Sequence, residues 1–117
     1  MILAQLGAEV IAIEPPEGQR SRYQGPFAGE TQDIEKSLTH WAYNRAKQSL
    51  VLDFDRRQDV QRFEDLAATS DAVVVSDPRT VDLESLGQRH PHLVTACISG
   101  FGETGPKSDW AASDIIN

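Results

Sequence analysis

Residues 93–106 read LVTACISGFGETGP, an apolar segment that runs directly into Gly100, Gly102 and Gly105. The apolar part predicts a buried β-strand. Glycine has no Cβ, so it adopts positive φ readily and lets a ligand approach the backbone closely. Open α/β sheets bind their ligands beyond the carboxyl ends of the strands. This junction therefore predicts a ligand site where a parallel strand ends.

The same three glycines match the G-x-G-x-x-G spacing of dinucleotide-binding proteins. That fingerprint opens a helix and is followed by an acidic residue about 20 positions later. Here Pro106 comes directly after the third glycine, and the chain ends at Asn117, before such an acidic residue can follow. Nicotinamide binding is therefore the least favoured hypothesis for this loop.

Composition limits the class of protein. A length of 117 residues with 39% hydrophobic and 25% charged residues is typical of one globular domain. A formal net charge of −7 and the lack of a dense Lys/Arg run argue against nucleic acid as a partner. The longest aliphatic runs, residues 10–13 and 72–75, are far shorter than the roughly 20 residues of a membrane span. We expect a cytoplasmic protein without a membrane partner, and we expect Cys97 to be a buried strand thiol.

The hydrophobic pattern predicts an α/β fold. Helices are expected at residues 1–6, 55–69 and 81–89, and strands at 9–14, 50–54, 71–76 and 93–98. Residues 16–39 show little periodicity and predict a long loop, which in a compact domain is often functional. The alternation of elements predicts a parallel sheet with helices on both faces. A first helix without a preceding strand predicts that the domain is incomplete.

Three segments together resemble a known family. They are residues 6–16 (LGAEVIAIEPP), 44–53 (NRAKQSLVLD) and 98–106 (ISGFGETGP). Their order and spacing resemble the family III CoA-transferases, also called the CaiB/BaiF family, over nearly the whole chain. The resemblance implies that residues 1–117 are a partial N-terminal Rossmann-like CoA-binding domain, with the first strand and the C-terminal part missing.

The resemblance also implies an activity and a partner. Members move coenzyme A between an acyl-CoA and a small carboxylic acid, through anhydride and thioester intermediates on an aspartate, as interlocked homodimers. CoA and acyl-CoA are substrates here, and no tightly bound cofactor is implied. The nucleophilic aspartate lies downstream of the segment matching residues 112–116, so we assign no catalytic residue and expect this chain alone to be inactive. The acyl donor and acceptor are not implied.

Two departures from the family pattern keep alternatives open. The usual Glu-Asn-Phe-Arg-Pro-Gly after the third strand is SDPRTV at residues 76–81 here, which weakens the expected CoA contacts in that segment. Related acyl-CoA racemases carry a histidine before the aspartate that corresponds to Asp114, where this chain has Ser113. A racemase fragment is thus less favoured than a transferase, and a non-catalytic CoA-binding or acyl-CoA-binding protein remains the alternative from another class.

A CoA site needs cations, backbone N–H groups and an apolar slot, because the ligand carries phosphates and adenine. The resemblance implies that Lys47 acts as a point charge on the phosphates and that Arg79 reaches into the cleft. Gly100 and Gly102 would let the pantetheine arm pass close to the backbone, with Phe101 as an apolar wall. The candidate CoA-binding residues are Lys47, Arg79, Arg45, Asp77, Gly100, Phe101 and Gly102.

Structural roles compete with these assignments. Lys47 can equally be a solvated loop lysine, and for Arg45 an ion pair with an acid such as Asp53 is slightly favoured. The remaining expectations are that Arg20 and Arg22 lie on the surface, that Trp41 and Tyr43 pack under the loop, and that Asp114 caps a helix. His90 and His92 have too few neighbouring ligand types to predict a metal site.

Overall fold

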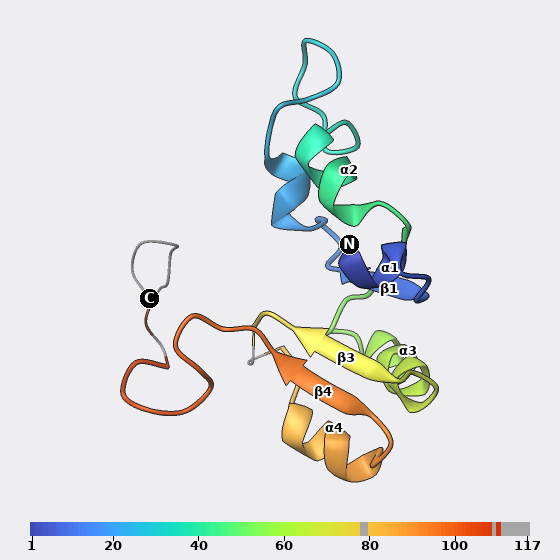
Figure 1. Ribbon diagram of the computed structural model, residues 1–117, viewed down its shortest axis with the longest axis vertical. Coiled ribbons are helices and arrows are strands. Elements are labelled where there is room, and N and C mark those ends of the chain that lie inside the picture. Colours follow the sequence, from blue (N-terminus) through green and yellow to red (C-terminus); the bar gives the residue numbers. More distant parts are fainter. Residues whose placement is uncertain (78–79, 109, 111–117) are drawn as a thin grey trace. The chain divides into compact units, whose positions relative to one another are not determined.

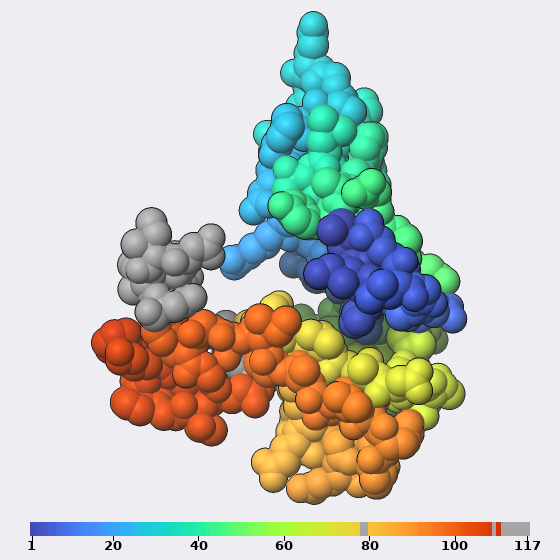
Figure 2. Space-filling view, viewed as in Figure 1, coloured from blue at the N-terminus to red at the C-terminus, as the bar shows by residue number. Residues whose placement is uncertain are grey.

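The computed structural model describes residues 1–77, 80–108 and 110 (Figure 1). The chain divides into two compact units, residues 1–60 and residues 61–117. Figure 2 shows their surfaces, with the first unit coloured from blue to green along the sequence. The predictions for Arg79, Ser113 and Asp114 lie outside the described residues.

The first unit contains one pair of parallel strands. Its elements are α1 (Ile2–Gln5), β1 (Val10–Glu14), a 3-10 helix η1 (Arg20–Tyr23), α2 (Leu38–Asn44) and β2 (Lys47–Val51). β1 and β2 pair in parallel, from Val10 opposite Lys47 to Glu14 opposite Val51. α1 ends just before Gly7, whose φ of 100° is the left-handed conformation that glycine adopts readily. The predicted strand at residues 50–54 is thus shifted, because β2 begins three residues earlier.

The second unit contains another parallel pair. β3 (Ala72–Val75) pairs with β4 (Val94–Cys97), and α4 (Leu83–Arg89) packs beside β4 (Figure 1). The helix α3 (Arg57–Ala68) precedes β3, as the amphipathic pattern predicted. Asp82 caps α4 by accepting a hydrogen bond from the Ser85 N–H at 3.0 Å. The apolar residues buried in this unit are Phe63, Ala67, Leu83, Leu86 and Leu93.

The strand pairing differs from the single sheet expected from the sequence. Each strand pair is parallel, as predicted, but the described strands form two two-stranded sheets, β1 with β2 and β3 with β4. Periodicity identifies a strand through its side chains, whereas pairing depends on backbone groups of residues that lie far apart in the sequence. The sequence pattern therefore predicted the positions of the strands better than it predicted which strands pair with each other.

The predicted loop at residues 16–39 is held by specific contacts, and α2 follows it directly. Phe27 and Ser37 form an isolated antiparallel bridge. Ser37 is buried, and its Oγ accepts a hydrogen bond from the His40 N–H at 3.0 Å, which caps α2. The same hydroxyl lies 2.9 Å from the Ser21 carbonyl oxygen and 2.6 Å from that of Gln24. The buried Ser37 thus caps the start of α2 and connects α2 to η1 by a hydrogen bond.

Replacing this serine is expected to destabilise the first unit. Ser37→Ala removes both the cap and the hydrogen bond to the η1 backbone, so the free energy of unfolding should fall by about 1–2 kcal/mol. Urea titration followed by circular dichroism measures this difference. The control is Ser76→Ala, an exposed serine, which should change stability by less than about 0.5 kcal/mol. Equal midpoints for Ser37→Ala and the unchanged chain would contradict the assigned role.

Candidate functional site

A cavity of about 390 Å³ lies within the first unit. Residues from β1, η1, α2 and β2 line it, together with Glu35 from the loop that precedes α2. The lining side chains used below are Glu14, Arg22, His40, Trp41, Arg45 and Lys47. Cations, carboxylates and an aromatic ring therefore face one space, which suits a ligand with both charged and aromatic parts.

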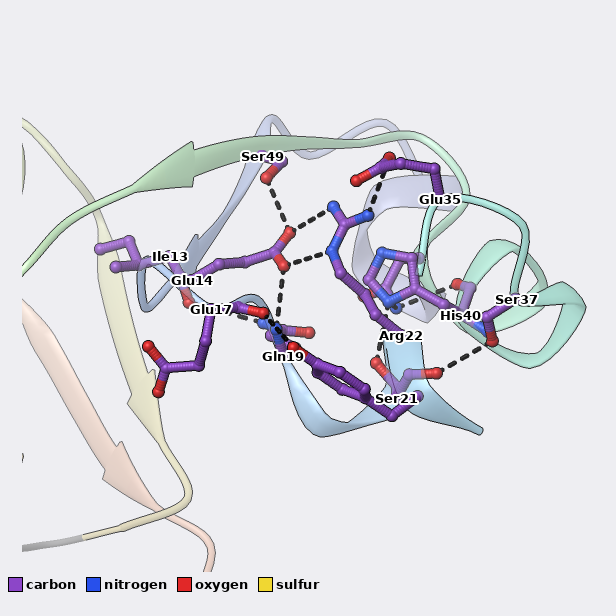
Figure 3. A network of polar contacts seen from close by, with 12 residues as sticks. Ile13, Glu14, Glu17, Gln19, Ser21, Arg22, Glu35, Ser37, His40 and Ser49 are labelled. Carbon is purple, nitrogen blue, oxygen red and sulfur yellow. Dashed lines mark hydrogen bonds and ion pairs between the residues drawn. The ribbon is translucent and has the colours of Figure 1, made fainter. Parts of the chain in front are cut away.

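Glu14, the last residue of β1, is only 2% exposed, yet donors satisfy both of its carboxylate oxygens (Figure 3). Its Oε2 accepts from Arg22 Nε at 2.6 Å and from the Gln19 N–H at 3.1 Å. Its Oε1 accepts from Arg22 Nη2 at 2.9 Å and from Ser49 Oγ at 2.7 Å. The bidentate arginine pair is the strongest of these contacts, because both partners are charged.

These contacts set the protonation of the pair. The hydrogen bond from Arg22 is the largest cause that lowers the pKa of Glu14 to about 2, and Ser49 and the Gln19 N–H lower it further while burial opposes them. The same carboxylate raises the pKa of Arg22. Arg22 was expected on the surface, and this expectation is wrong: its side chain is only 14% exposed. Arg20 is exposed, as expected.

A glycine turn brings Arg22 onto Glu14. Gly18 has a φ of 86°, and its N–H donates to the Pro15 carbonyl at 2.8 Å. A Cβ at this position would lie 2.9 Å from Arg22 Cδ. Glycine is therefore required here both by the backbone conformation and by the close approach of the arginine. The ion pair between Glu14 and Arg22 depends on this turn. The residue types alone therefore did not predict the pair.

Lys47 and Arg45 are the predicted site residues that the first unit brings together. Lys47 begins β2, is half-buried, and donates from Nζ to Asn44 Oδ1 at 2.8 Å. Arg45 is exposed at the cavity, and the described residues hold no ion pair between it and Asp53. Asp53 instead pairs with Arg56, with Nε and Oδ2 3.1 Å apart. The favoured structural role for Arg45 is therefore wrong.

The two aromatic residues of α2 are not packed as expected. Trp41 is 48% exposed and Tyr43 is 64% exposed. Trp41 lines the cavity, and its Nε1 donates to the Glu35 carbonyl at 3.0 Å. That hydrogen bond fixes the indole while leaving half of its surface accessible. Trp41 can therefore offer a ring face to a ligand.

The other described candidates belong to the second unit. Gly100, Phe101 and Gly102 follow β4, and Gly102 has a φ of 84°. The Phe101 ring lies edge-to-face against Trp110 with centroids 6.2 Å apart, and Lys107 Nζ lies 5.8 Å and 5.2 Å from the two ring centroids. Asp77, after β3, is half-buried. Gly100, Phe101 and Gly102 therefore lie in a loop beyond the carboxyl end of β4, as the glycine pattern indicated.

Cys97, His90 and His92 lie in the second unit. Cys97 is half-buried in β4, and burial is the main cause that raises the pKa of its thiol. His90 Nε2 lies 3.8 Å from a carboxylate oxygen of Glu64, and its ring contacts His92 edge-to-face. In the part of the chain that the structure describes, no three His, Cys, Asp or Glu side chains are grouped to hold a metal. The described helices also include none long and apolar enough to cross a bilayer.

Sequence reasoning missed Glu14, Ser21, His40 and Asn44. Glu14 could have been found, because a carboxylate at the end of an apolar strand indicates a buried charge, and a buried charge requires a partner. His40 could have been placed in the first turn of a helix, because Ser37 lies three residues before it and serine is a common helix N-cap. The hydrogen bonds among Ser21, His40 and Asn44 have no comparable signal, because they depend on the fold of the intervening loop.

Stability should depend on pH through Glu14. The folded pKa of about 2 lies below the usual value, so the folded state binds fewer protons between about pH 2 and 4.5. Its contribution is therefore complete above about pH 5 and is lost as the pH falls toward 2, by on the order of 2–3 kcal/mol. Urea midpoints at pH 7, 5, 4 and 3 measure this loss.

Two variants separate the effect of Glu14 from other effects of acid on the chain. Glu14→Gln should flatten the acid dependence of stability, whereas Glu17→Gln, which changes an exposed carboxylate, should leave it as in the unchanged chain. Identical acid profiles for Glu14→Gln and Glu17→Gln would show that Glu14 does not carry the effect.

Comparisons with known proteins agree with the resemblance noted in the sequence. CoA-transferase family III matches residues 1–117. The succinate–glutarate CoA-transferase of Agrobacterium fabrum is 36% identical over 124 residues, which cover 98% of this chain and 31% of that protein. The acetyl-CoA:oxalate CoA-transferase of Acetobacter aceti is 35% identical over 122 residues, which cover 98% of this chain and 30% of that protein.

Solved structures give the same result. A crystal structure of a CaiB/BaiF family protein from Brucella suis aligns with a TM-score of 0.83 at 33% identity, over 97% of this chain and 32% of that one. The chain thus spans about a third of the length of these relatives. The family match covers every residue of the chain and confirms the predicted family. The chain belongs to family III of the CoA-transferases.

Proposed function

We propose that this chain supplies a coenzyme A-binding part of an enzyme that moves CoA between an acyl-CoA and a small carboxylic acid. The observation that carries the proposal is the family match over residues 1–117. The transferases of Agrobacterium fabrum and Acetobacter aceti cited above are named for such transfers. The cavity of the first unit supports the assignment of CoA through its charge and its aromatic wall.

The charges in the cavity suit the phosphates of CoA. Arg22 is neutralised by Glu14 and also pairs with Glu35, with Nη1 and Oε2 3.2 Å apart. The cations left for a ligand are therefore Lys47, which is held by the neutral Asn44, and Arg45. An ammonium group that is fixed but not neutralised can act as a point charge on a phosphate.

Trp41 supplies the apolar element that a nucleotide needs. Its half-exposed indole is anchored by one hydrogen bond, so little side-chain entropy is lost when a flat ring stacks on it. In this proposal adenine packs on Trp41 while its phosphates approach Lys47 and Arg45.

The chemical step is assigned outside the described residues. In the mechanism that the family resemblance implies, an aspartate forms anhydride and thioester intermediates with the acyl group and with CoA. The residues named here bind and orient CoA. A homodimer and a cytoplasmic location belong to the same proposal.

Removing the Lys47 ammonium should weaken CoA binding. Lys47→Ala is expected to raise the Kd for CoA about tenfold, equivalent to about 1.4 kcal/mol, because a fixed cation no longer faces the phosphates. Isothermal titration calorimetry on the 117-residue chain measures the Kd. The matched control is Lys36→Ala, a lysine paired with Asp33 outside the cavity lining, for which the Kd should change less than about twofold.

Two results would reject the proposal. One is a chain that shows correct secondary structure by circular dichroism but does not bind CoA. The other is tighter binding of NADH than of CoA, which would restore the nicotinamide hypothesis for the glycine loop. If Lys47→Ala and Lys36→Ala weaken CoA binding equally, the phosphates do not lie at the cavity.

A further inference from the structure

His40 is a buried imidazole with one nitrogen that no group in the described residues uses. It lies in the first turn of α2, lines the cavity and is 7% exposed. Its Nδ1 lies 2.8 Å from Ser21 Oγ and 3.2 Å from Asn44 Nδ2. Figure 3 shows the imidazole between η1 and α2 with Ser21 beside it. The direction of these hydrogen bonds decides which nitrogen carries the proton.

The orientation of the Asn44 amide follows from its other partners. Lys47 Nζ can only donate, so the atom 2.8 Å from it is the Asn44 oxygen. The His40 carbonyl can only accept, so the atom 3.0 Å from it is the amide nitrogen. Asn44 Nδ2 is therefore a donor toward His40 Nδ1. Nδ1 must accept that bond, and the Ser21 hydroxyl can donate to it as well.

The charge of His40 is fixed by its surroundings. Burial is the main cause that lowers its pKa below the usual 6.5; Arg22 and Lys47 lower it further, while Glu14 and Glu35 oppose them. The ring is therefore neutral at pH 7 and carries one proton. Since Nδ1 accepts hydrogen bonds, that proton is on Nε2.

The Nε2–H is the other polar group of the ring. No residue in the described part of the chain accepts a hydrogen bond from it. The described residues also contain no fully buried side-chain nitrogen or oxygen without a partner. Nε2 is therefore accessible, and His40 is one of the residues that line the cavity. A buried ring thus presents one oriented, uncharged N–H to a ligand.

We propose that His40 is a specificity-determining residue of the site, whose Nε2–H donates a hydrogen bond to an oxygen or ring nitrogen of the CoA nucleotide. This inference rests on the proposed binding of CoA. Asn44 is the positioning residue, because one amide holds both the Lys47 ammonium and the His40 tautomer. Asn44 thereby holds the Lys47 ammonium and the neutral His40 donor close to each other at the cavity.

The tautomer can be measured without any ligand. Long-range proton–nitrogen correlation spectra of the 15N-labelled chain at pH 7 distinguish the three histidines and report which ring nitrogen is protonated. The signals of His40 are those missing in His40→Gln. We expect a neutral ring with the proton on Nε2, and we expect CoA to shift the Nε2 resonance. A proton on Nδ1, or a charged ring at pH 7, would overturn the inference.

Asn44→Asp tests the positioning role directly. The aspartate offers only acceptor oxygens, so His40 Nδ1 should become a donor, and the tautomer should switch or the ring should become charged at pH 7. A merely structural asparagine would not change the proton on His40. An unchanged tautomer in a folded Asn44→Asp variant would therefore contradict the role assigned to Asn44.

Binding variants complete the experiment. His40→Phe should raise the Kd for CoA about tenfold, equivalent to about 1.4 kcal/mol, whereas His40→Gln, whose amide N–H can reach toward the position of Nε2–H, should stay within about threefold. If the unchanged chain binds CoA but the Nε2 resonance does not shift, the inference fails while the proposed function stands. If the unchanged chain does not bind CoA, both fail.

Discussion

The buried carboxylate of Glu14 is the constraint around which the first unit is organised. A charge that is 98% shielded from solvent is tolerated only when donors satisfy it. Those donors come from three places: Arg22 on η1, Ser49 on β2 and the backbone of Gln19. The strand pair and the loop after β1 are therefore joined at one carboxylate. The Gly18 turn is the backbone feature that makes this possible.

The use of Arg22 in this pair determines what the cavity can do. An arginine occupied by two carboxylates contributes little attraction for an anion, so Lys47 and Arg45 carry that role. Ser21, directly before Arg22 in η1, contacts His40 in α2, and Asn44 connects His40 to Lys47. The ion pair thus fixes η1, and η1 in turn orients the polar groups that face a ligand.

The sequence predicted the elements that have strong periodicity and missed those set by single contacts. Strands β1, β3 and β4 and helices α3 and α4 lie where the pattern of apolar residues placed them. α2 was missed because its beginning depends on one capping serine, and its aromatic residues Trp41 and Tyr43 are exposed rather than packed. Arg22 was placed on the surface because its partner is reached only through the Gly18 turn. Family motifs suggested Lys47 as a candidate, but not the contacts of His40 and Asn44 near it.

A double-mutant cycle between Glu14 and Arg22 tests this account most directly. The free energy of unfolding is measured at pH 7 for the unchanged chain, Glu14→Gln, Arg22→Gln and the double variant. We expect a coupling energy of about 2–3 kcal/mol, because each single variant leaves a buried charge or its donors without the matching partner. Effects that add to within about 0.5 kcal/mol would contradict the claim that this pair organises the unit.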